Sequence, residues 1–499
     1  MEVDILISVV LLAEVLARRL RESTTLISTM DKAPDSILIV GSGLLGLSSA
    51  WALTKRPFFD NTAITVVDHA NGQFPPDDAA SVDTSRIVRA DYADPDYAAL
   101  GAEAQEVWRK QGDGDVGGQG RYSENGLIVT AYSSSAPQVG EKSGMDYAKA
   151  SWENVCKIAA ASGDASKIVE LKSRRAIQDY ADVVDSGDWG YVNKLSGWAN
   201  NGEAMKWLYQ KVKSTGRVKF VDGRVEELVT EGKTVTGAKL SDGTILHASL
   251  VFCAAGAWTG SLIDVRGRCE ATGHAMGYLK ITPEEQAMLE HRSSIINFTT
   301  GLFIIPPRDG VLKAARHGFG YLNPQTVTKA LPLSPSHERK PIVASIPRTT
   351  RDGGPDRFPP DAEQDLRQAL REMLPIKGLE NRPWIKTRLC WYSDTRDADW
   401  LADWHPGWDG LFVATGDSGH AFKFMPVIGE KLVDCFQGKG GKLGEKWRWK
   451  QVENDGLGTE SNGTYNGLIT WDGSRGGHPG MILDEELRKL DDGRPRSKL

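Results

Sequence analysis

Residues 36–46 read Ser-Ile-Leu-Ile-Val-Gly-Ser-Gly-Leu-Leu-Gly, and this stretch decides the fold. It predicts a buried strand over 37–40, a glycine-rich turn over 41–46 and a helix over 47–53. A second apolar run, 63–67, ends at Asp68, about 20 residues after Gly46. This order of strand, glycine turn, helix, strand and acid is typical of a site for an adenine dinucleotide.

Each residue type in such a turn has a physical task. Gly41 permits the tight turn, Gly43 lets the backbone approach a pyrophosphate, and Gly46 lets the helix pack closely on the strand. The N-terminus of the helix offers unpaired N–H groups to phosphate, and Asp68 can accept hydrogen bonds from an adenosine ribose. The alternative is a glycine-rich turn with only a structural role. The cofactor-binding candidates of this motif are Gly41, Ser42, Gly43, Leu44, Leu45, Gly46 and Asp68.

Composition narrows the class of protein. The 499 residues are 40% hydrophobic and 25% charged, as in soluble globular proteins, and roughly two to four domains are expected. A net charge of −6 provides no basic surface for nucleic acid or an acidic membrane. The five cysteines are scattered without CxxC spacing, which argues against a structural metal site or a disulfide framework and favours a reducing compartment.

The two ends of the chain carry different signals. Residues 5–17 are mostly apolar but too short to span a bilayer, so we expect no membrane span. We expect instead an amphipathic extension, or an upstream extension of the gene with Met30 as the working start; a signal peptide is the less favoured alternative. The chain ends in Ser497-Lys498-Leu499, which predicts recognition by the peroxisomal import receptor. The alternative location is the cytoplasm.

The order of apolar runs predicts an α/β chain, α+β overall, in which a Rossmann-like nucleotide-binding domain is discontinuous. Runs at 303–307, 311–317 and 342–346 predict a second, inserted domain built on a mixed or antiparallel sheet. Arg86 and Arg89 are expected on a short turn or helix, pointing to nearly the same side. The predicted boundaries are an extension over 1–35, a nucleotide-binding domain over 36–110, 200–260 and 385–437, a substrate domain over 111–199 and 261–384, and a loop or tail over 438–499.

Four blocks together resemble flavoproteins of the D-amino-acid-oxidase type, in the branch of the sarcosine, pipecolate and saccharopine oxidases and the fructosyl-amino-acid oxidases. The blocks span residues 36–435 in family order. The resemblance implies FAD, a two-domain fold and oxidation of a secondary amine by O₂. The blocks are 37–46 with Asp68, Asp-Thr-Ser-Arg-Ile-Val-Arg at 83–89, Leu-Lys-Ala-Ala-Arg-His at 312–317, and Cys-Trp-Tyr at 390–392 with Gly-Asp-Ser-Gly-His-Ala-Phe-Lys-Phe at 416–424.

The resemblance assigns two residues to the flavin. Cys390 stands where this branch ties its flavin covalently, which requires a thiolate in a partly exposed, electropositive setting. Lys313 matches a lysine that activates O₂ by stabilising the negative charge of nascent superoxide. The alternatives are a buried structural thiol and a solvated strand lysine. Further cofactor contacts are expected from Ser85, Arg86, Ile87, Val225, Gly256, Gly419, Phe422 and Lys423.

The resemblance also implies a substrate site. Arg89 and Lys423 match a pair that grips the substrate carboxylate, with a structural salt bridge as the alternative. His317 and Tyr392 match residues that face the flavin and shape the amine pocket; the alternative is a core histidine and a packed tyrosine.

The predicted reaction transfers a hydride from the carbon beside a secondary amine to the flavin. It yields an imine, and O₂ then reoxidises the flavin to give H₂O₂. The presence of Tyr392 and Lys423 favours sarcosine-, pipecolate- or saccharopine-type substrates over fructosyl amino acids. Alternatives are a fructosyl-amino-acid oxidase, a tailoring oxidase of secondary metabolism that traps the imine internally, a non-catalytic flavin-binding protein, and an NAD-linked dehydrogenase.

Overall fold

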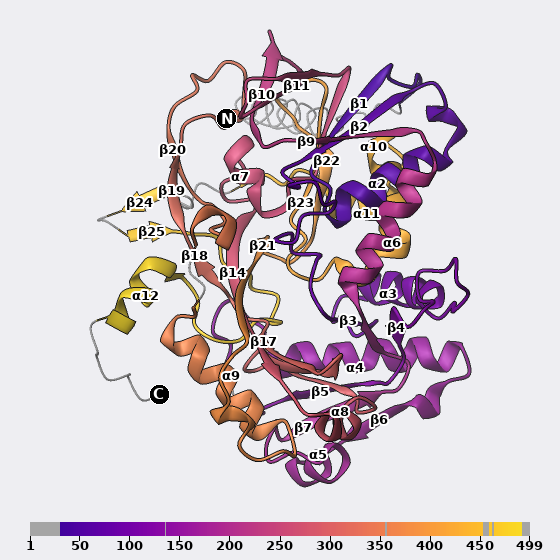
Figure 1. Cartoon of the computed structure of the whole chain (residues 1–499), viewed down its shortest axis with the longest axis vertical. Helices are drawn as coiled ribbons and strands as arrows, with labels where there is room; N and C mark the ends of the chain where they lie inside the picture. Colours follow the sequence, from indigo (N-terminus) through magenta and orange to yellow (C-terminus); the bar gives the residue numbers. More distant parts are fainter. Residues whose placement is uncertain (1–29, 135, 355–356, 453–458, 462–463, 492–499) are drawn as a thin grey trace, which may run out of the picture.

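Two sheets of different construction dominate the computed structural model, which describes residues 30–134, 136–354, 357–452, 459–461 and 464–491 (Figure 1). The predicted extension up to residue 29 and the terminal Ser497-Lys498-Leu499 lie outside these residues. No helix in the described part is long and apolar enough to cross a membrane.

The first sheet has six strands and contains the glycine-turn stretch at its centre. Five of its strands are parallel neighbours, and β22 is an antiparallel edge strand. Parallel strands that are buried on both faces require nearly continuous apolar runs, and β1 and β23 have them. The α/β prediction is confirmed. The strand order is β22 (Leu401–Trp404), β23 (Leu411–Thr415), β13 (Leu250–Cys253), β1 (Ser36–Val40), β2 (Ala63–Asp68) and β9 (Val218–Asp222).

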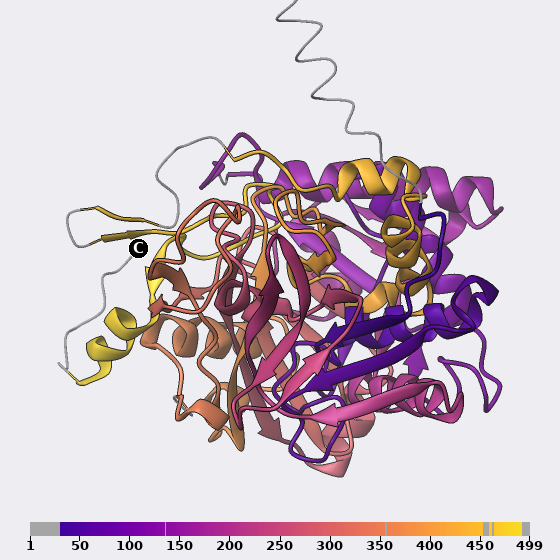
Figure 2. The ribbon, with the colours of Figure 1, turned by 90° about the horizontal axis from the view of Figure 1, so that it is seen from above.

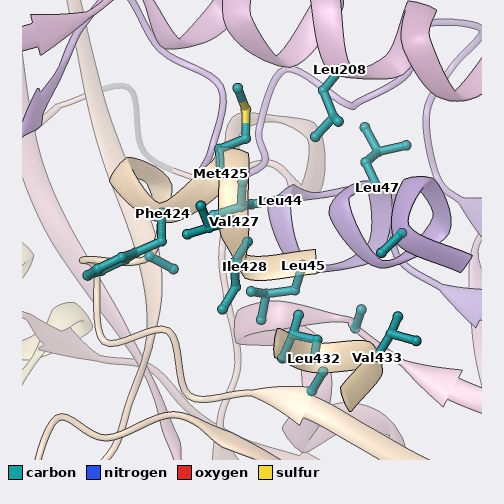
Figure 3. Packing of buried hydrophobic residues seen from close by; sticks show 14 of the residues in the cluster. Leu44, Leu45, Leu47, Leu208, Phe424, Met425, Val427, Ile428, Leu432 and Val433 are labelled. Atoms are coloured by element: carbon teal, nitrogen blue, oxygen red, sulfur yellow. The ribbon is translucent and has the colours of Figure 1, made fainter. Parts of the chain in front are cut away.

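Close packing of helices α2 (Leu44–Lys55) and α10 (Met425–Phe436) joins distant parts of the chain. Figure 3 shows their leucine, isoleucine and valine side chains interleaved in one cluster. A Cβ atom at Gly429 of α10 would clash with the backbone of Ser48 of α2, so a glycine lets the helices approach. Helices α6 (Asn201–Ser214) and α3 (Pro95–Trp108) contact α2 and α10, respectively.

The second sheet has ten strands, most of them antiparallel. Strand β21 lies in the stretch 385–437 that was expected to belong to the nucleotide-binding domain. It pairs with β14 along its whole length instead, and its last six residues are buried on both faces of the large sheet. The strands are β26 (Met481–Ile482), β18 (Tyr321–Leu322), β14 (Glu270–Lys280), β17 (Val311–Arg316), β16 (Leu302–Arg308), β15 (Ser294–Asn297), β5 (Leu127–Ala131), β7 (Trp189–Asn193), β6 (Ile168–Leu171) and β21 (Lys386–Asp394).

Helices and small sheets complete the described fold. A turn at 241–243 joins two antiparallel strands, β11 and β12. The helices are α4 (Gly144–Ala161), α5 (Arg174–Ala181), α7 (Thr259–Leu262), α8 (Pro283–Leu289), α9 (Pro360–Glu372), α11 (Gly441–Lys446) and α12 (Leu483–Asp491). The small sheets are β10 (Val225–Glu231), β11 (Thr234–Leu240) and β12 (Ile245–His247); β3 (Arg86–Val88), β8 (Gly197–Ala199) and β4 (Tyr122–Ser123); β19 (Pro324–Val327) and β20 (Ile342–Ser345); and β24 (Thr459–Ser461) and β25 (Thr464–Asn466).

Two expectations are wrong. Arg86 begins strand β3 and Arg89 follows its end, so the arginines do not share a side as they would on a helix. The part beyond residue 438 is not only a loop or tail, since β26 joins the large sheet and Leu483 of α12 is fully buried. Figures 1 and 2 both show α12 on the opposite side of the molecule from α2.

Candidate functional site

The glycine turn has the geometry that its sequence predicts. Gly41 has φ +107°, and a Cβ atom there would clash with the carbonyl oxygen of Ala254. A Cβ atom at Gly46 would clash with the carbonyl oxygen of Gly41. A Cβ atom at Gly43 would lie 3.9 Å from the Ser81 hydroxyl and no closer to any other heavy atom. Gly41 and Gly46 therefore serve the turn and its packing, whereas Gly43 leaves room for a ligand.

A cavity of about 440 Å³ opens beside this turn. Gly43 caps helix α2 without a side-chain hydrogen bond, so the helix N-terminus at this cavity keeps unpaired N–H groups. The far end of the cavity reaches Trp391, Asp417 and Ala421. Of the predicted cofactor-binding residues, Gly41, Gly43, Leu44, Leu45, Asp68, Val225 and Gly256 line it.

Asp68 lines the same cavity and also braces the turn. Its Oδ2 accepts hydrogen bonds from the backbone N and the hydroxyl of Ser42, both at 2.7 Å. Its Oδ1 accepts one from His69 N at 2.8 Å. Burial raises the pKa of Asp68, and the bonds from Ser42 and His69 oppose that rise. Each carboxylate oxygen has two acceptor positions, so Asp68 retains capacity for a ribose hydroxyl.

The remaining predicted cofactor-binding residues lie away from this cavity wall. Gly46 packs under the turn, Phe422 packs against Trp108, and Ile87 pairs with Trp198 in a small sheet. A Cβ atom at Gly419 would clash with the ring of Tyr392. The residues that do not line the cavity are Ser42, Gly46, Ser85, Arg86, Ile87, Cys390, Gly419, Phe422 and Lys423.

One face of the large sheet gathers three of the predicted site residues. Tyr278 of β14 lies opposite Lys313 of β17, and His274 and Thr272 of β14 lie opposite Cys390 and Tyr392 of β21. Directly opposed residues of an antiparallel pair share a face, and so do alternate residues of one strand. Lys313, Cys390 and Tyr392 therefore project from the same side of the sheet.

A buried ion cluster holds Lys313 in place. Its Nζ lies 3.0 Å from Asp83 Oδ2 and also donates to the carbonyl oxygen of Ser85. Asp83 also pairs with Arg86 and accepts a hydrogen bond from the Tyr278 hydroxyl. Burial opposes the charge on Asp83, but Lys313 and Arg86 still hold the pKa of this carboxyl far below its usual range. Burial lowers the pKa of Lys313 to about 8.

Cys390 is buried, with 0% exposure, so the expectation of a partly exposed thiol is wrong. Its Sγ lies 3.4 Å from Arg86 Nη2 and 3.9 Å from the carbonyl oxygen of Ala80. Ala80 lines the cavity, which places the sulfur just behind the cavity wall. The guanidinium provides the electropositive setting expected for this sulfur.

The two residues proposed to bind a carboxylate, Arg89 and Lys423, both lie close to the ring of Tyr92. The guanidinium carbon of Arg89 lies 4.6 Å from the centre of the Tyr92 ring, and Lys423 Nζ lies 5.3 Å from it. Lys423 Nζ donates to the Tyr92 hydroxyl at 2.9 Å and to the His420 carbonyl at 2.7 Å. Arg89 is buried, and its Nη1 has no hydrogen-bond partner among the described residues. Burial and then the charge of Arg89 lower the pKa of Lys423.

His317 and Tyr392 lie near each other, with ring centres 6.2 Å apart. Burial lowers the pKa of His317 well below its usual range, so the imidazole is neutral. The His274 ring stacks on the Tyr392 ring, and the two ring centres are 3.8 Å apart. No cluster of metal-ligating side chains occurs in the described part of the chain.

Comparison with known proteins decides the family. A model of the family described as FAD dependent oxidoreductase matches residues 36–435. The chain belongs to this family. Amino acid oxidase imqH of Aspergillus flavus is 32% identical over 83% of this chain and 95% of that protein. L-saccharopine oxidase of Schizosaccharomyces pombe is 30% identical over 84% of this chain and 94% of that protein.

Solved structures agree with this family. A modified fructosyl peptide oxidase from Aspergillus nidulans superposes with a TM-score of 0.74, covering 91% of this chain and 99% of that one at 24% identity. This likeness shows the fold. The predictions of an FAD-dependent oxidoreductase and of an amine- or amino-acid-oxidase type of chemistry are confirmed.

The residues of this FAD-dependent oxidoreductase fit its cofactor. Gly43 leaves open space at the uncapped N-terminus of α2, where backbone N–H groups can bind the pyrophosphate. Asp68 lies at the end of the next strand, beside the same cavity. These residues would hold the dinucleotide, and Arg86 and Cys390 lie next to the same cavity through their contacts with the carbonyl oxygen of Ala80.

Sequence reasoning gave no role to several residues of this site. Asp83 lay in a quoted block, but its contact with Lys313 depends on the approach of β3 to β17. Arg475 lay in the presumed tail, and its glycine-rich surroundings carry no signal of burial. The residues missed are Asp83, Tyr92, His274, Tyr278, Asp394 and Arg475.

Proposed function

We propose that this protein oxidises a secondary amine that carries a carboxylate, with FAD as cofactor and O₂ as acceptor. The observation that carries the proposal is the pairing of two cationic groups at one site. The buried Lys313–Asp83–Arg86 cluster lies on the cofactor side. Arg89 and Lys423 lie 4.6 Å and 5.3 Å from the centre of the same Tyr92 ring, close enough together for one substrate carboxylate to contact both.

FAD, when bound, supplies the hydride acceptor and passes the electrons to O₂. Lys313 contributes a positive charge fixed by Asp83 and Ser85 O, and this charge stabilises the negative charge that develops on O₂. His317 is neutral, and it offers a ring nitrogen for a hydrogen bond with the neutral amine, which is the form that can give up a hydride. Lys313 is buried and His317 is partly buried, which limits the access of water to the amine.

The proposed carboxylate site is supported by buried basic side chains, one of which has an unpaired donor. Arg89 is a buried cation, and its Nη1 is a buried donor without a partner among the described residues. Lys423 is a buried amine, and burial and the charge of Arg89 lower its pKa well below the usual range. A substrate carboxylate would satisfy both, since arginine binds carboxylates through two parallel hydrogen bonds. Replacing Arg89 by Met should weaken substrate binding by about 1.5–3 kcal/mol. An unchanged KM for every amino-acid substrate would contradict this role.

A panel of amines tests the proposed reaction. Sarcosine, N-methyl amino acids, L-pipecolate, saccharopine, fructosyl-lysine and fructosyl-valine are each offered to the purified protein, and H₂O₂ is measured. Similarity to an L-saccharopine oxidase supports N-substituted amino acids as substrates. Each amine is paired with an analogue without its carboxylate, which should be oxidised poorly. A protein that retains FAD but forms no peroxide with any amine would instead be a non-catalytic flavin-binding protein.

Covalent attachment of the flavin through Cys390 is part of the proposal. The sulfur lies behind the cavity wall, and the Arg86 guanidinium Nη2 is 3.4 Å from it. Acid-precipitated protein should stay yellow, and Cys390→Ala should release its flavin. Cys269→Ala, which removes another buried thiol, is the matched control. A colourless pellet from the unaltered protein would exclude the link.

The proposed compartment is the peroxisome, where the H₂O₂ product meets catalase. The support is Ser497-Lys498-Leu499, which lies outside the described residues. A fluorescent protein fused before residue 1 should enter peroxisomes, and the same fusion without these three residues should stay in the cytoplasm. Equal distribution of the two fusions would contradict the proposal.

A further inference from the structure

Arg475 is a buried cation from the part of the chain that follows the family match. The match ends at residue 435, and Arg475 lies between strands β25 and β26. The residue is 5% exposed. Its Nη1 lies 3.1 Å from Nδ1 of His317, and its Nη2 donates to Asp394 Oδ1 at 2.7 Å and to the Ser418 carbonyl at 2.8 Å.

The backbone next to Arg475 also forms a hydrogen bond with the backbone of His317. Gly476 N donates to the carbonyl oxygen of His317 at 3.3 Å, and His317 N donates to that of Gly301 at 2.7 Å. A Cβ atom at Gly476 would clash with the backbone at Thr300 and Gly301. The segment 475–476 therefore packs tightly against residues 300–301 and against the backbone of His317.

We propose that Arg475 is a positioning residue that holds His317 as the neutral tautomer with its proton on Nε2. A guanidinium has only donors, so Nδ1 must accept in this hydrogen bond. A neutral imidazole with an accepting Nδ1 carries its proton on Nε2. Asp394 and the Ser418 carbonyl fix the guanidinium in turn, so the imidazole has one orientation. The inference rests on the proposed function in one respect, namely that His317 faces the amine.

The charges around His317 act in the same direction. Burial is the main cause of its lowered pKa, and the positive charge of Arg475 is the next. His274, Arg89 and Lys423 add to the effect from three other parts of the chain. Two carboxyl groups and a phenol also face this group: Asp394 pairs with Arg475, Asp472 lies near Arg475, and the Tyr392 ring centre is 5.9 Å from the guanidinium.

A role limited to the Arg475–Asp394 ion pair is the competing explanation. That pair would stabilise the fold without governing the proton on His317. Two substitutions separate the explanations. Arg475→Gln keeps an amide donor for Nδ1 but removes the charge, whereas Arg475→Met removes both.

The test uses the full-length holoenzyme with ¹⁵N-labelled histidine side chains, observed by NMR. His317→Asn identifies the His317 signals among those of the nine histidines. In the unaltered protein, His317 should remain neutral with the proton on Nε2 between about pH 5 and 8. In Arg475→Gln the tautomer should persist while the pKa rises. In Arg475→Met the tautomers should mix and the pKa should move towards about 6.5.

Enzyme kinetics provide a second readout. Arg475→Met should add an acid limb to the kcat/KM profile, with up to a tenfold loss for each pH unit below the new pKa. An Arg475→Met protein that folds but keeps the unaltered tautomer and pH profile would overturn the inference. If Arg475→Met does not fold, a mixed tautomer in the unaltered protein or in Arg475→Gln would overturn it. If no amine is oxidised but the NMR result holds, the proposed function fails and the positioning role stands.

Discussion

Asp83 controls the charge balance at the centre of the site. Its carboxylate joins Lys313, Arg86 and the Tyr278 hydroxyl in a buried cluster. Two cations and one anion leave a net positive charge, which a low-dielectric interior makes costly unless an anionic group approaches. A site of this charge is prepared for negative charge that appears during the reaction.

Lys313→Met should slow reoxidation by O₂ far more than reduction by the amine. Removing one preorganised positive charge costs roughly 10²–10³-fold in comparable sites. Stopped-flow absorbance measures the two half-reactions separately. Lys280→Met, on the exposed end of β14, is the control and should leave both rates unchanged. Equal slowing of the two half-reactions would remove Lys313 from the O₂ step.

Reoxidation by O₂ should also decline as pH rises. Burial lowers the pKa of Lys313 to about 8, so its positive charge is present below this pH and lost above it. Asp83→Asn removes the anion that raises this pKa, so the decline should begin at a lower pH. The measurement is the second-order rate constant with O₂ as a function of pH. A constant rate up to pH 10 would contradict the assignment.

At the scale of the elements, the close contact between helices α2 and α10 is the main feature. Gly429 lets α10 touch α2, and both helices carry buried aliphatic residues along the contact (Figure 3). Because α2 also presents its N-terminus to the cavity, its contact with α10 helps to fix the position of the glycine turn beside the cavity.

Gly429→Ala should lower the free energy of unfolding by about 1–3 kcal/mol, because the added methyl group overpacks the contact with Ser48. Gly444→Ala in α11 is the matched control, since its Cβ atom would lie 3.7 Å from Cys435 Sγ, an ordinary contact. Urea unfolding of the two variants gives the comparison. Equal stabilities would mean that the helices separate without cost.

Local signals and long-range contacts differ in how well the sequence reveals them. The glycine turn and helix α2 are encoded by residue types within a few positions, and both lie where the sequence predicts them. Strand β21 joins the large sheet by pairing with β14, which lies roughly 100 residues earlier in the sequence. The residue pattern of β21 alone therefore does not reveal which strand it pairs with. Lys313 and Cys390 were found by resemblance, whereas Asp83 required the tertiary contact.

At the scale of the whole molecule, the chain after residue 438 completes the fold. Strand β26 extends the large sheet, and Leu483 and Leu487 of α12 join the core that also contains helix α9. Arg475 brings the same segment into contact with His317. The chain after residue 438 is polar and rich in glycine, and its few buried residues form no periodic apolar pattern. The sequence alone therefore did not predict these contacts.

Leu483→Ala should therefore destabilise the protein by about 2–5 kcal/mol, as expected for a leucine buried in a packed core. Arg488→Ala, at an exposed position of the same helix, should change the free energy of unfolding by less than about 0.5 kcal/mol. Chemical denaturation measures both. If Leu483→Ala behaves like Arg488→Ala, α12 contributes nothing to the stability of the core.

Anaerobic mixing of the purified protein with the amine panel tests the central claim most directly. The account predicts that at least one secondary amine with a carboxylate bleaches the visible flavin band, and that O₂ restores the band with release of one H₂O₂ per cycle. A flavin band that no amine bleaches, or a purified protein without flavin, would contradict it.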